Sequence, residues 1–366
     1  MGPSDWAHHN PVRIVGGTLD DLSRHLPNCR HVLLVTSLGF TRRGVTAKVR
    51  SLFADRQVTI YDKVRPNPDL DALDSATAAY GSLKIDGVVG LGGGSALDAA
   101  KVLAVTLHDP LPKPLDHVLR QGKPHAWAGR LPLAAVPTTA GTGAEVTPFA
   151  TVWDHLARNK YSLAGPQVYP DVALLDAALT LSLPPAETLY PGLDATSHAL
   201  ESLWNRNRTP VSSALAMRAL ALIVEALPGV LEKPEDLGLR RRMQEASVLA
   251  GLAISQTRTA LAHAISYPLT THFGVTHGLA CSFTLPALLR LNLPFLAKNG
   301  CDEKVLLATL AVLERFALAK RLAELVPAGA VVGLKDFMTN KDRSGNYAGL
   351  LPDGLDGLLQ RALLQA

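Results

Sequence analysis

An aspartate and three histidines in the second half of the chain have the types and spacing of a metal site. Asp194 and His198 are four residues apart in PGLDATSHALESLW, and His263 and His277 are fourteen apart in an apolar segment. Residues four apart share one face of a helix, so this carboxylate and imidazole would point into the same space. One carboxylate and three imidazoles suit a borderline ion such as Fe²⁺ or Zn²⁺ better than Ca²⁺ or Mg²⁺, which prefer oxygen ligands.

Three elements must converge to bring these side chains together. Pro268 and Gly274 interrupt the second segment, which predicts a turn between His263 and His277. A buried histidine is commonly a hydrogen-bonded core residue, and nine other histidines compete for the assignment: His8, His9, His25, His31, His108, His117, His125, His155 and His272. The local sequence, rather than the number of histidines, favours the four named residues.

The segments LDATSHALES and LAHAISYPLTTHFGVTHGLACSFTLP resemble the two metal-ligand signatures of the iron-containing (group III) alcohol dehydrogenases. The resemblance implies that Asp194, His198, His263 and His277 hold one catalytic ion, Fe²⁺ or Zn²⁺. It also implies reduction of an aldehyde or ketone by NADH or NADPH, in which the metal acts as a Lewis acid on the carbonyl oxygen. Members of this family are commonly homodimers.

Arg258 and Thr257 are candidates for substrate binding. Arg258 lies five residues before His263 in a segment with few other charges, and hydroxyl residues flank it. This segment is similar to a subgroup that reduces phosphonoacetaldehyde to 2-hydroxyethylphosphonate, and the paired donors of a guanidinium match two phosphonate oxygens. An arginine bonded to helix-end carbonyls or to an acidic neighbour is the alternative.

Tyr267 is a candidate for proton transfer, because many family members carry a histidine at this position. A tyrosine hydroxyl can donate a proton, but its ordinary pKa near ~10 makes it a less ready shuttle than imidazole. His272 is a candidate to compensate. The alternative is that Tyr267 only packs or forms a hydrogen bond.

The composition excludes several classes of protein. The chain of 366 residues is 47% hydrophobic and 19% charged, enough for two domains with cores. A net charge of +4 without a basic stripe argues against nucleic acid as a partner. Three widely spaced cysteines, no signal-like N-terminus and no run near the roughly 20 apolar residues of a membrane span predict a cytoplasmic protein that does not bind membranes.

The first half of the chain alternates apolar runs with helical patterns. Strands are expected at residues 31–36, 58–61, 87–91 and 133–136, with a helix over 70–83. This alternation predicts a doubly wound parallel sheet with helices on both faces. The family resemblance adds a strand within 170–176 that ends this domain.

Two glycine-containing loops are candidates for binding the dinucleotide. In GLGGGSALDAAK, the glycines let the backbone approach a phosphate and Ser95 is expected to cap the next helix. A turn without a ligand is the alternative for this loop and for PTTAGTGAEVT. The resemblance assigns the following residues to the cofactor: Asn67, Gly92, Gly93, Gly94, Ser95, Asp98, Thr138, Thr139, Thr142 and Lys160.

Ser37 departs from the family pattern in a way that bears on the cofactor. Many members have an aspartate here that binds the adenosine ribose hydroxyls. Without that carboxylate, and with Arg42 and Arg43 close by, the 2′-phosphate of NADPH becomes acceptable. Arginines that simply face water are the alternative.

Long helical periodicity replaces the strands after Pro184. Helices are expected over 186–204, 211–231, 239–254 and 305–325. The sequence therefore predicts a dinucleotide-binding domain over residues 1–183 and an all-helical metal-binding domain over 184–366, a dehydroquinate synthase-like architecture. The expected function is NAD(P)H-linked reduction of a small anionic aldehyde such as phosphonoacetaldehyde. The alternatives are a dehydrogenase for neutral alcohols or other acidic aldehydes, a dehydroquinate-synthase-like lyase, and a non-catalytic nucleotide-binding protein.

Overall fold

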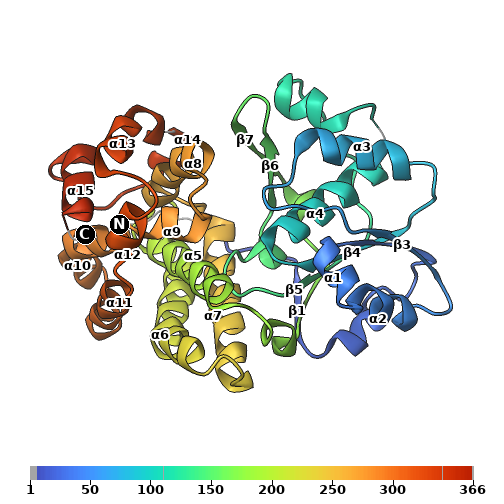
Figure 1. Ribbon diagram of the computed structural model, residues 1–366, viewed down its shortest axis with the longest axis horizontal. Coiled ribbons are helices and arrows are strands. Elements are labelled where there is room, and N and C mark those ends of the chain that lie inside the picture. Colours follow the sequence, from blue (N-terminus) through green and yellow to red (C-terminus); the bar gives the residue numbers. More distant parts are fainter. Residues whose placement is uncertain (1–5, 110, 340, 365–366) are drawn as a thin grey trace. The chain divides into compact units, whose positions relative to one another are not determined.

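The computed structural model describes residues 6–109, 111–339 and 341–364 and contains two compact units (Figure 1). One unit comprises residues 11–139 and 144–180. The other comprises residues 6–10, residues 140–143 and the chain from residue 181 onward. A short segment between two parts of the first unit thus belongs to the second.

A six-stranded parallel sheet forms the centre of the first unit, in the order β1-β8-β5-β4-β2-β3. Its strands are β1 (Arg13–Gly16), β2 (His31–Val35), β3 (Gln57–Tyr61), β4 (Gly87–Gly92), β5 (Leu133–Pro137) and β8 (Val172–Leu175). Every residue of β2, β4 and β5 is buried. Strands buried on both faces read as continuous apolar runs, which is why the sequence revealed them.

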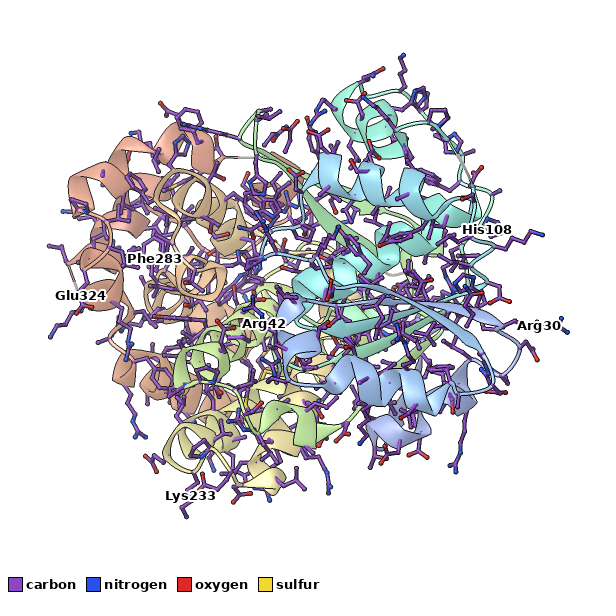
Figure 2. All side chains as sticks on the ribbon, turned by 45° about the vertical axis from the view of Figure 1, so that its right-hand side comes forward. Arg30, Arg42, His108, Lys233, Phe283 and Glu324 are labelled. Carbon is purple, nitrogen blue, oxygen red and sulfur yellow. The ribbon has the colours of Figure 1, made fainter. Side chains whose placement is uncertain are left out.

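Alternate side chains of these strands pack into two separate cores. Leu33 and Val35 belong to one core, whereas Val32 and Leu34 belong to the other. Helices α3 (Leu70–Tyr80) and α4 (Gly94–His108) contribute to the first core, and α2 (Val45–Leu52) to the second. Side chains thus cover both faces of the sheet, as in the predicted doubly wound fold (Figure 2).

Three strands of this unit were not expected from the sequence. The short β1 pairs with β8 at one edge of the sheet. In addition, β6 (Phe149–Asp154) and β7 (Asn159–Ala164) form an antiparallel hairpin apart from the sheet. Four-residue strands and a hairpin with partly exposed residues lack the continuous apolar run that marks a central strand.

The second unit is helical, and its bounds follow the predicted periodicity closely. The first three long helices are α5 (Pro185–Leu203), α6 (Pro210–Glu232) and α7 (Leu237–Thr257). After them come α8 (Leu261–Phe273), α9 (His277–Ser282), α10 (Leu285–Lys298), α11 (Glu303–Arg315), α12 (Leu318–Ala323), α13 (Ala328–Gly333), α14 (Lys341–Ser344) and α15 (Gly354–Leu363). One large apolar core joins these helices, with the exception of α14.

Two predicted features of the helical unit are wrong in detail. The helix expected over 305–325 is broken into α11 and α12, because Ala317 adopts φ +47°. Pro268 lies inside α8 and does not end it; only Gly274, at φ +66°, terminates the helix. A proline removes one backbone donor, yet a helix can continue through it when the surrounding packing holds both halves.

Two segments meet the length and hydropathy of a membrane span, contrary to the sequence prediction. They are Pro210–Glu232 and His277–Lys298, with mean hydropathies of 1.8 and 1.4. Both contribute buried side chains to the core of the helical unit, including Leu220, Ile223 and Leu288. Core helices of a bundle reach the same hydropathy, so these two segments are weak evidence for a membrane protein.

Candidate functional site

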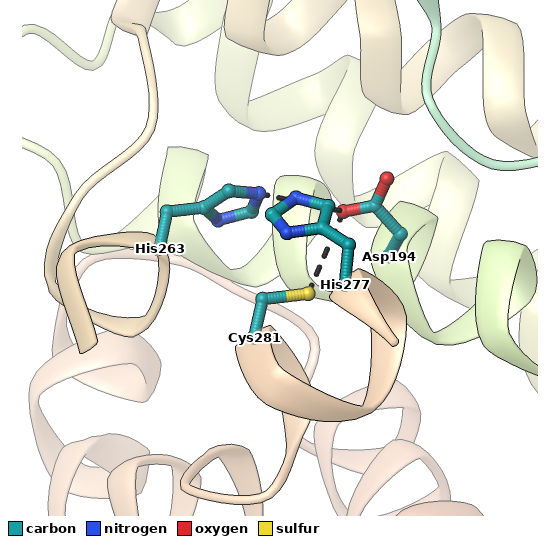
Figure 3. A group of neighbouring side chains, drawn as sticks. All are labelled: Asp194, His263, His277 and Cys281. Atoms are coloured by element: carbon teal, nitrogen blue, oxygen red, sulfur yellow. Dashed lines mark hydrogen bonds and ion pairs between the residues drawn. The ribbon is translucent and has the colours of Figure 1, made fainter. Parts of the chain in front are cut away.

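The structure brings Asp194, His198, His263 and His277 together in the helical unit. The Nε2 atoms of His198 and His263 each lie 3.3 Å from Oδ1 of Asp194, and Nε2 of His277 lies 3.7 Å from the same oxygen. Helix α5 supplies the aspartate and the first histidine, α8 supplies His263, and His277 is the first residue of α9. Figure 3 shows three of these side chains converging.

Glycines determine how closely the elements of this cluster approach. Gly274 turns the chain after α8, which allows a new helix to begin at His277. At Gly278, a Cβ atom would lie 1.9 Å from the carbonyl oxygen of Tyr190 in α5. Only glycine permits this contact between α9 and α5, and the contact places His277 beside Asp194.

The cluster is buried on all sides but one. The side chains of Asp194, His198 and His263 are at most 6% exposed, whereas that of His277 is 35% exposed. An ion in this cluster would therefore be reached from the His277 side. Catalytic metal sites need such an open position, which closed structural sites lack.

Mutual electrostatics set the charge states of these side chains before an ion binds. Burial would raise the pKa of Asp194, but the charges of the three histidines outweigh burial and hold the pKa well below its ordinary range. Burial lowers the pKa of His198, and its neighbour His263 lowers it further. A carboxylate that stays ionised beside a neutral imidazole is ready to bind a cation.

The donor set fits a divalent metal ion. Nε2 of His263 is buried and forms no hydrogen bond, although it lies near Asp194 Oδ1. An orphaned buried nitrogen costs free energy unless another group satisfies it. Three imidazole nitrogens lie within 3.7 Å of Asp194 Oδ1, and an Fe²⁺ or Zn²⁺ ion bound by these donors would satisfy that requirement.

Glu201 orients His263 and was missed in the sequence. Its Oε2 atom lies 2.6 Å from Nδ1 of His263, its Oε1 accepts from the backbone N–H of the same residue, and it is fully buried. Burial would raise the pKa of Glu201, but the charge and hydrogen bond of His263 lower it. In many metal sites a carboxylate accepts a hydrogen bond from one ring nitrogen of a histidine while the other nitrogen binds the metal. The carboxylate thereby fixes the tautomer of the histidine. A sequence signal existed, because residues 194, 198 and 201 fall on one helical face.

Cys281 is the second residue that sequence reasoning missed. Its thiol donates to Oδ1 of Asp194 at 3.5 Å, and one donor atom each from Asp194, His263, His277 and Cys281 all lie within 4.8 Å of one another. Burial, followed by the charge of Asp194, raises the pKa of this thiol well above its ordinary value. A protonated thiol is a poor ligand, so we assign the fourth position to the neutral imidazole of His198.

Tyr267 packs beside the cluster, whereas His272 does not. The Tyr267 ring is parallel to that of His277 within 4°, with ring centres 6.3 Å apart. Burial raises the pKa of Tyr267 to about 12. His272 is exposed, and its ring lies against Phe337.

The two candidate substrate residues lie at the end of α7. Arg258 is exposed, adopts φ +63°, and its carbonyl accepts from Nδ2 of Asn205. The hydroxyl of Thr257 is fully buried and bonds to Ala253 O and Ser202 Oγ. These bonds keep the threonine hydroxyl inside the helical unit.

In the sheet unit, the glycine loop and two neighbouring loops come together. Helix α4 begins at Gly94 with Gly93 as its N-cap, so the expectation that Ser95 caps the helix is wrong. Instead, Oγ of Ser95 accepts from the backbone N–H of Asn67 at 3.3 Å. A Cβ atom at Gly93 would lie 3.3 Å from Thr139 Oγ1. A helix N-terminus bordered by glycine and hydroxyl groups is suited to a diphosphate.

Asp98 and the adjacent Lys101 hold the protein's own backbone. Asp98 accepts from the N–H of Thr151 at 2.9 Å. Nζ of Lys101 donates to the carbonyls of Thr147 and Phe149, each at 2.9 Å, and the residue is 1% exposed. Both side chains thus fasten the hairpin segment that follows the threonine-rich loop.

The remaining candidate cofactor residues lie at several places. Thr138 is buried and its N–H donates to Gly92 O, while Thr142 belongs to the short segment of the helical unit. Nζ of Lys160 lies over the ring of Trp153 at 5.4 Å. Ser37 precedes α1 (Leu38–Arg42), and a Cβ at Gly39 would lie 3.2 Å from Nη1 of Arg43 and 3.7 Å from Ser37 Oγ.

Comparison with known proteins matches nearly the whole chain. Residues 11–177 match the family described as iron-containing alcohol dehydrogenase, and residues 188–340 match the C-terminal part of the Fe-containing alcohol dehydrogenase family. The chain is 37% identical over 326 residues to a phosphonoacetaldehyde reductase of Streptomyces viridochromogenes, covering 87% of this chain and 80% of that protein. It is 34% identical over 283 residues to a 1-propanol dehydrogenase of Citrobacter freundii, covering 75% and 70% respectively.

A solved protein structure is similar to this chain over nearly its whole length. The sulfoacetaldehyde reductase of Bifidobacterium kashiwanohense, in complex with NAD⁺, superimposes with a TM-score of 0.86 at 27% identity and covers 99% of each chain. Its two-domain plan of a parallel-sheet unit and a helical unit is the one described above.

Proposed function

The chain belongs to the iron-containing alcohol dehydrogenase family, and we propose that it reduces a small anionic aldehyde, such as phosphonoacetaldehyde, to the corresponding alcohol. Interconversion of an alcohol and an aldehyde with a nicotinamide cofactor is the activity of the family. The convergence of three imidazole nitrogens on Asp194 Oδ1 is the observation that carries the proposal.

Asp194, His198, His263 and His277 would hold the metal ion. A bound Fe²⁺ or Zn²⁺ supplies a Lewis acid that polarises a carbonyl group, and NADH or NADPH supplies the hydride. Asp194 lowers the net charge of the site, and Glu201 holds a proton on Nδ1 of His263, so that Nε2 is the nitrogen that faces the ion. The residues of the cluster thus prepare the site before substrate arrives.

Tyr267 would supply the proton that completes the alcohol. Its pKa of about 12 keeps the hydroxyl protonated throughout the neutral range. A protonated hydroxyl at this position can donate to the oxygen on which negative charge develops as the hydride is transferred. Its ring also lies parallel to that of His277, with ring centres 6.3 Å apart.

We propose NADPH as the preferred cofactor, with NADH as the alternative. Ser37 carries no negative charge, and Arg43 lies close to it with its guanidinium over the Phe40 ring. The 2′-phosphate of NADPH would be attracted by the guanidinium of Arg43. An aspartate at position 37 would instead repel this phosphate. The glycine loop at the start of α4 would receive the diphosphate.

Two similar proteins support an anionic substrate, and one supports a neutral one. The names phosphonoacetaldehyde reductase and sulfoacetaldehyde reductase denote aldehydes with an oxyanion on the next carbon. The Citrobacter relative acts on 1-propanol, so a neutral short-chain alcohol is the second candidate.

Initial rates of NADPH and NADH oxidation by anaerobically purified, Fe²⁺-loaded protein test the proposal. The substrates are phosphonoacetaldehyde, neutral propanal and acidic succinic semialdehyde. We expect strong selectivity for phosphonoacetaldehyde. Equal or faster turnover of propanal would favour the neutral-alcohol function, and no turnover of any aldehyde by metal-loaded protein would contradict the reductase assignment.

A further inference from the structure

A guanidinium lies against the aromatic ring that packs on a candidate metal ligand. Cζ of Arg343, in α14, lies 4.4 Å from the centre of the Tyr267 ring. The same ring stacks in parallel on His277, with centres 6.3 Å apart. A single tyrosine ring therefore links a cation to the one metal ligand that is substantially exposed.

Arg343 has no carboxylate partner among the side chains that the structure describes. Nine other arginines form ion pairs within the described part of the chain: Arg24, Arg56, Arg120, Arg130, Arg218, Arg242, Arg290, Arg315 and Arg361. Arg343 is also half-buried, and a cation withdrawn from water costs free energy unless something compensates it. The ring of Tyr267 compensates in part through a cation–π contact, but it cannot occupy the five N–H donors of the guanidinium.

The fold, and not the arginine side chain alone, holds this cation in place. The N–H of Asn346 donates to Arg343 O at 2.8 Å, and its side-chain Nδ2 donates to Thr259 O at 3.0 Å. The N–H of Arg206 donates to Asn346 O, and that of Ala348 donates to Trp204 O. These bonds fasten the segment after α14 to the C-terminal ends of α7 and of α5, the helix that carries Asp194 and His198.

We propose that Arg343 determines specificity by binding the anionic group of the substrate. This inference rests on the proposed function, since it requires an aldehyde whose carbonyl is held at the metal ligands. The guanidinium would take two oxygens of a phosphonate or sulfonate with its paired N–H donors. A two-carbon aldehyde would then be held at both ends, with its anion at Arg343 and its carbonyl beside His277.

Arg343 serves this role better than Arg258, the arginine that the sequence suggested. Arg258 is exposed at the C-terminal end of α7 and forms hydrogen bonds to the described residues through its backbone only. Arg343 is half-buried and is connected to the metal cluster through one ring. A cation partly removed from water attracts an anion more strongly than one in full contact with solvent.

The experiment compares Arg343→Met, Arg343→Lys and Arg258→Ala with the unaltered, Fe²⁺-loaded enzyme. Values of kcat/KM are measured for phosphonoacetaldehyde, sulfoacetaldehyde and propanal. Ethylphosphonate, which has no carbonyl, serves as a competitive inhibitor that reports binding without turnover. Metal content and circular dichroism show whether each variant keeps its fold and its ion.

We expect Arg343→Met to lower the preference for the two anionic aldehydes over propanal by about 10- to 100-fold and to weaken ethylphosphonate inhibition similarly. Arg343→Lys should restore part of the preference, because it keeps the charge but loses the paired donors. Arg258→Ala should change the preference by less than Arg343→Met does.

Three results would overturn the inference. If Arg343→Met keeps its metal and its preference for the anionic aldehydes over propanal, another residue binds the anionic group. A larger loss in Arg258→Ala would assign it to Arg258. Equal kcat/KM for propanal and the anionic aldehydes in the unaltered enzyme would remove the anion site altogether. By contrast, failure of the unaltered enzyme to reduce any aldehyde would refute the proposed function itself.

Discussion

Oε2 of Glu201 lies 2.6 Å from Nδ1 of His263, and both residues are buried. This hydrogen bond determines which nitrogen of His263 faces the other candidate ligands. With Nδ1 engaged by the carboxylate, Nε2 is left toward Asp194, where a metal ion would bind.

Replacing this carboxylate by an amide should weaken metal binding. Glu201→Gln keeps the size of the side chain but removes its charge, and we expect about 10- to 100-fold lower affinity for Zn²⁺. Competition with a chelator measures the affinity, and the d–d spectrum of the Co²⁺-loaded protein reports ligand geometry. Unchanged affinity and spectrum would show that Glu201 serves only packing.

Metal affinity should rise with pH. Burial would lower the pKa of His263, but Glu201 and Asp194 raise it from 6.5 to about 9 in the metal-free protein. The proton on His263 therefore stabilises the metal-free fold fully below pH 6.5, and this contribution is lost as the pH rises through 9. Because a metal ion must displace this proton, apparent affinity should increase about tenfold per pH unit in that window. Chelator competition at several pH values tests this, and an affinity independent of pH would contradict it.

Removal of the Tyr267 hydroxyl should slow turnover without releasing the metal. Tyr267→Phe keeps the ring that stacks on His277 and deletes the proposed proton donor, so we expect kcat to fall about 100-fold. Metal content should match that of the unaltered enzyme. Full kcat in this variant would restrict Tyr267 to packing.

Ser37→Asp should shift cofactor preference from NADPH toward NADH. The new carboxylate would accept hydrogen bonds from ribose hydroxyls and repel a 2′-phosphate near Arg43. Ser37→Asn, of the same size but uncharged, is the matched control and should shift the preference less. The ratio of kcat/KM for NADPH to kcat/KM for NADH is compared among the unaltered enzyme and the two variants. An identical ratio in all three would show that Ser37 does not select the cofactor.

Sequence patterns predicted the wholly buried strands and the partly exposed β3, and missed β1, β6 and β7. The central strands β2, β4 and β5 are wholly buried, so each reads as an apolar run, whereas β1 and the β6-β7 hairpin are partly exposed. Pro268 predicted a break, but tertiary packing carries α8 through it. A local sequence pattern contains no information about tertiary packing, which can override the local preference of a residue such as proline.

The candidate ligands were named from the sequence because their spacing is local, and the residues that support them were not. Glu201 lies on the same face of α5 as Asp194 and His198, so periodicity contained a signal for it. Arg343 lies far along the chain from Tyr267, and no local pattern connects the two. Contacts between distant segments become visible only in the folded chain.

The metal content of His263→Ala tests the central claim most directly. The unaltered protein, His263→Ala and His272→Ala are loaded with Fe²⁺ under anaerobic conditions, freed of excess metal and analysed by mass spectrometry for bound iron. His272 is exposed and packs against Phe337 rather than in the cluster, so its variant controls for loss of a histidine. We predict one ion per chain in the unaltered protein and in His272→Ala, and neither ion nor aldehyde reduction in His263→Ala. Retained iron and full turnover in His263→Ala would contradict the assignment of this site.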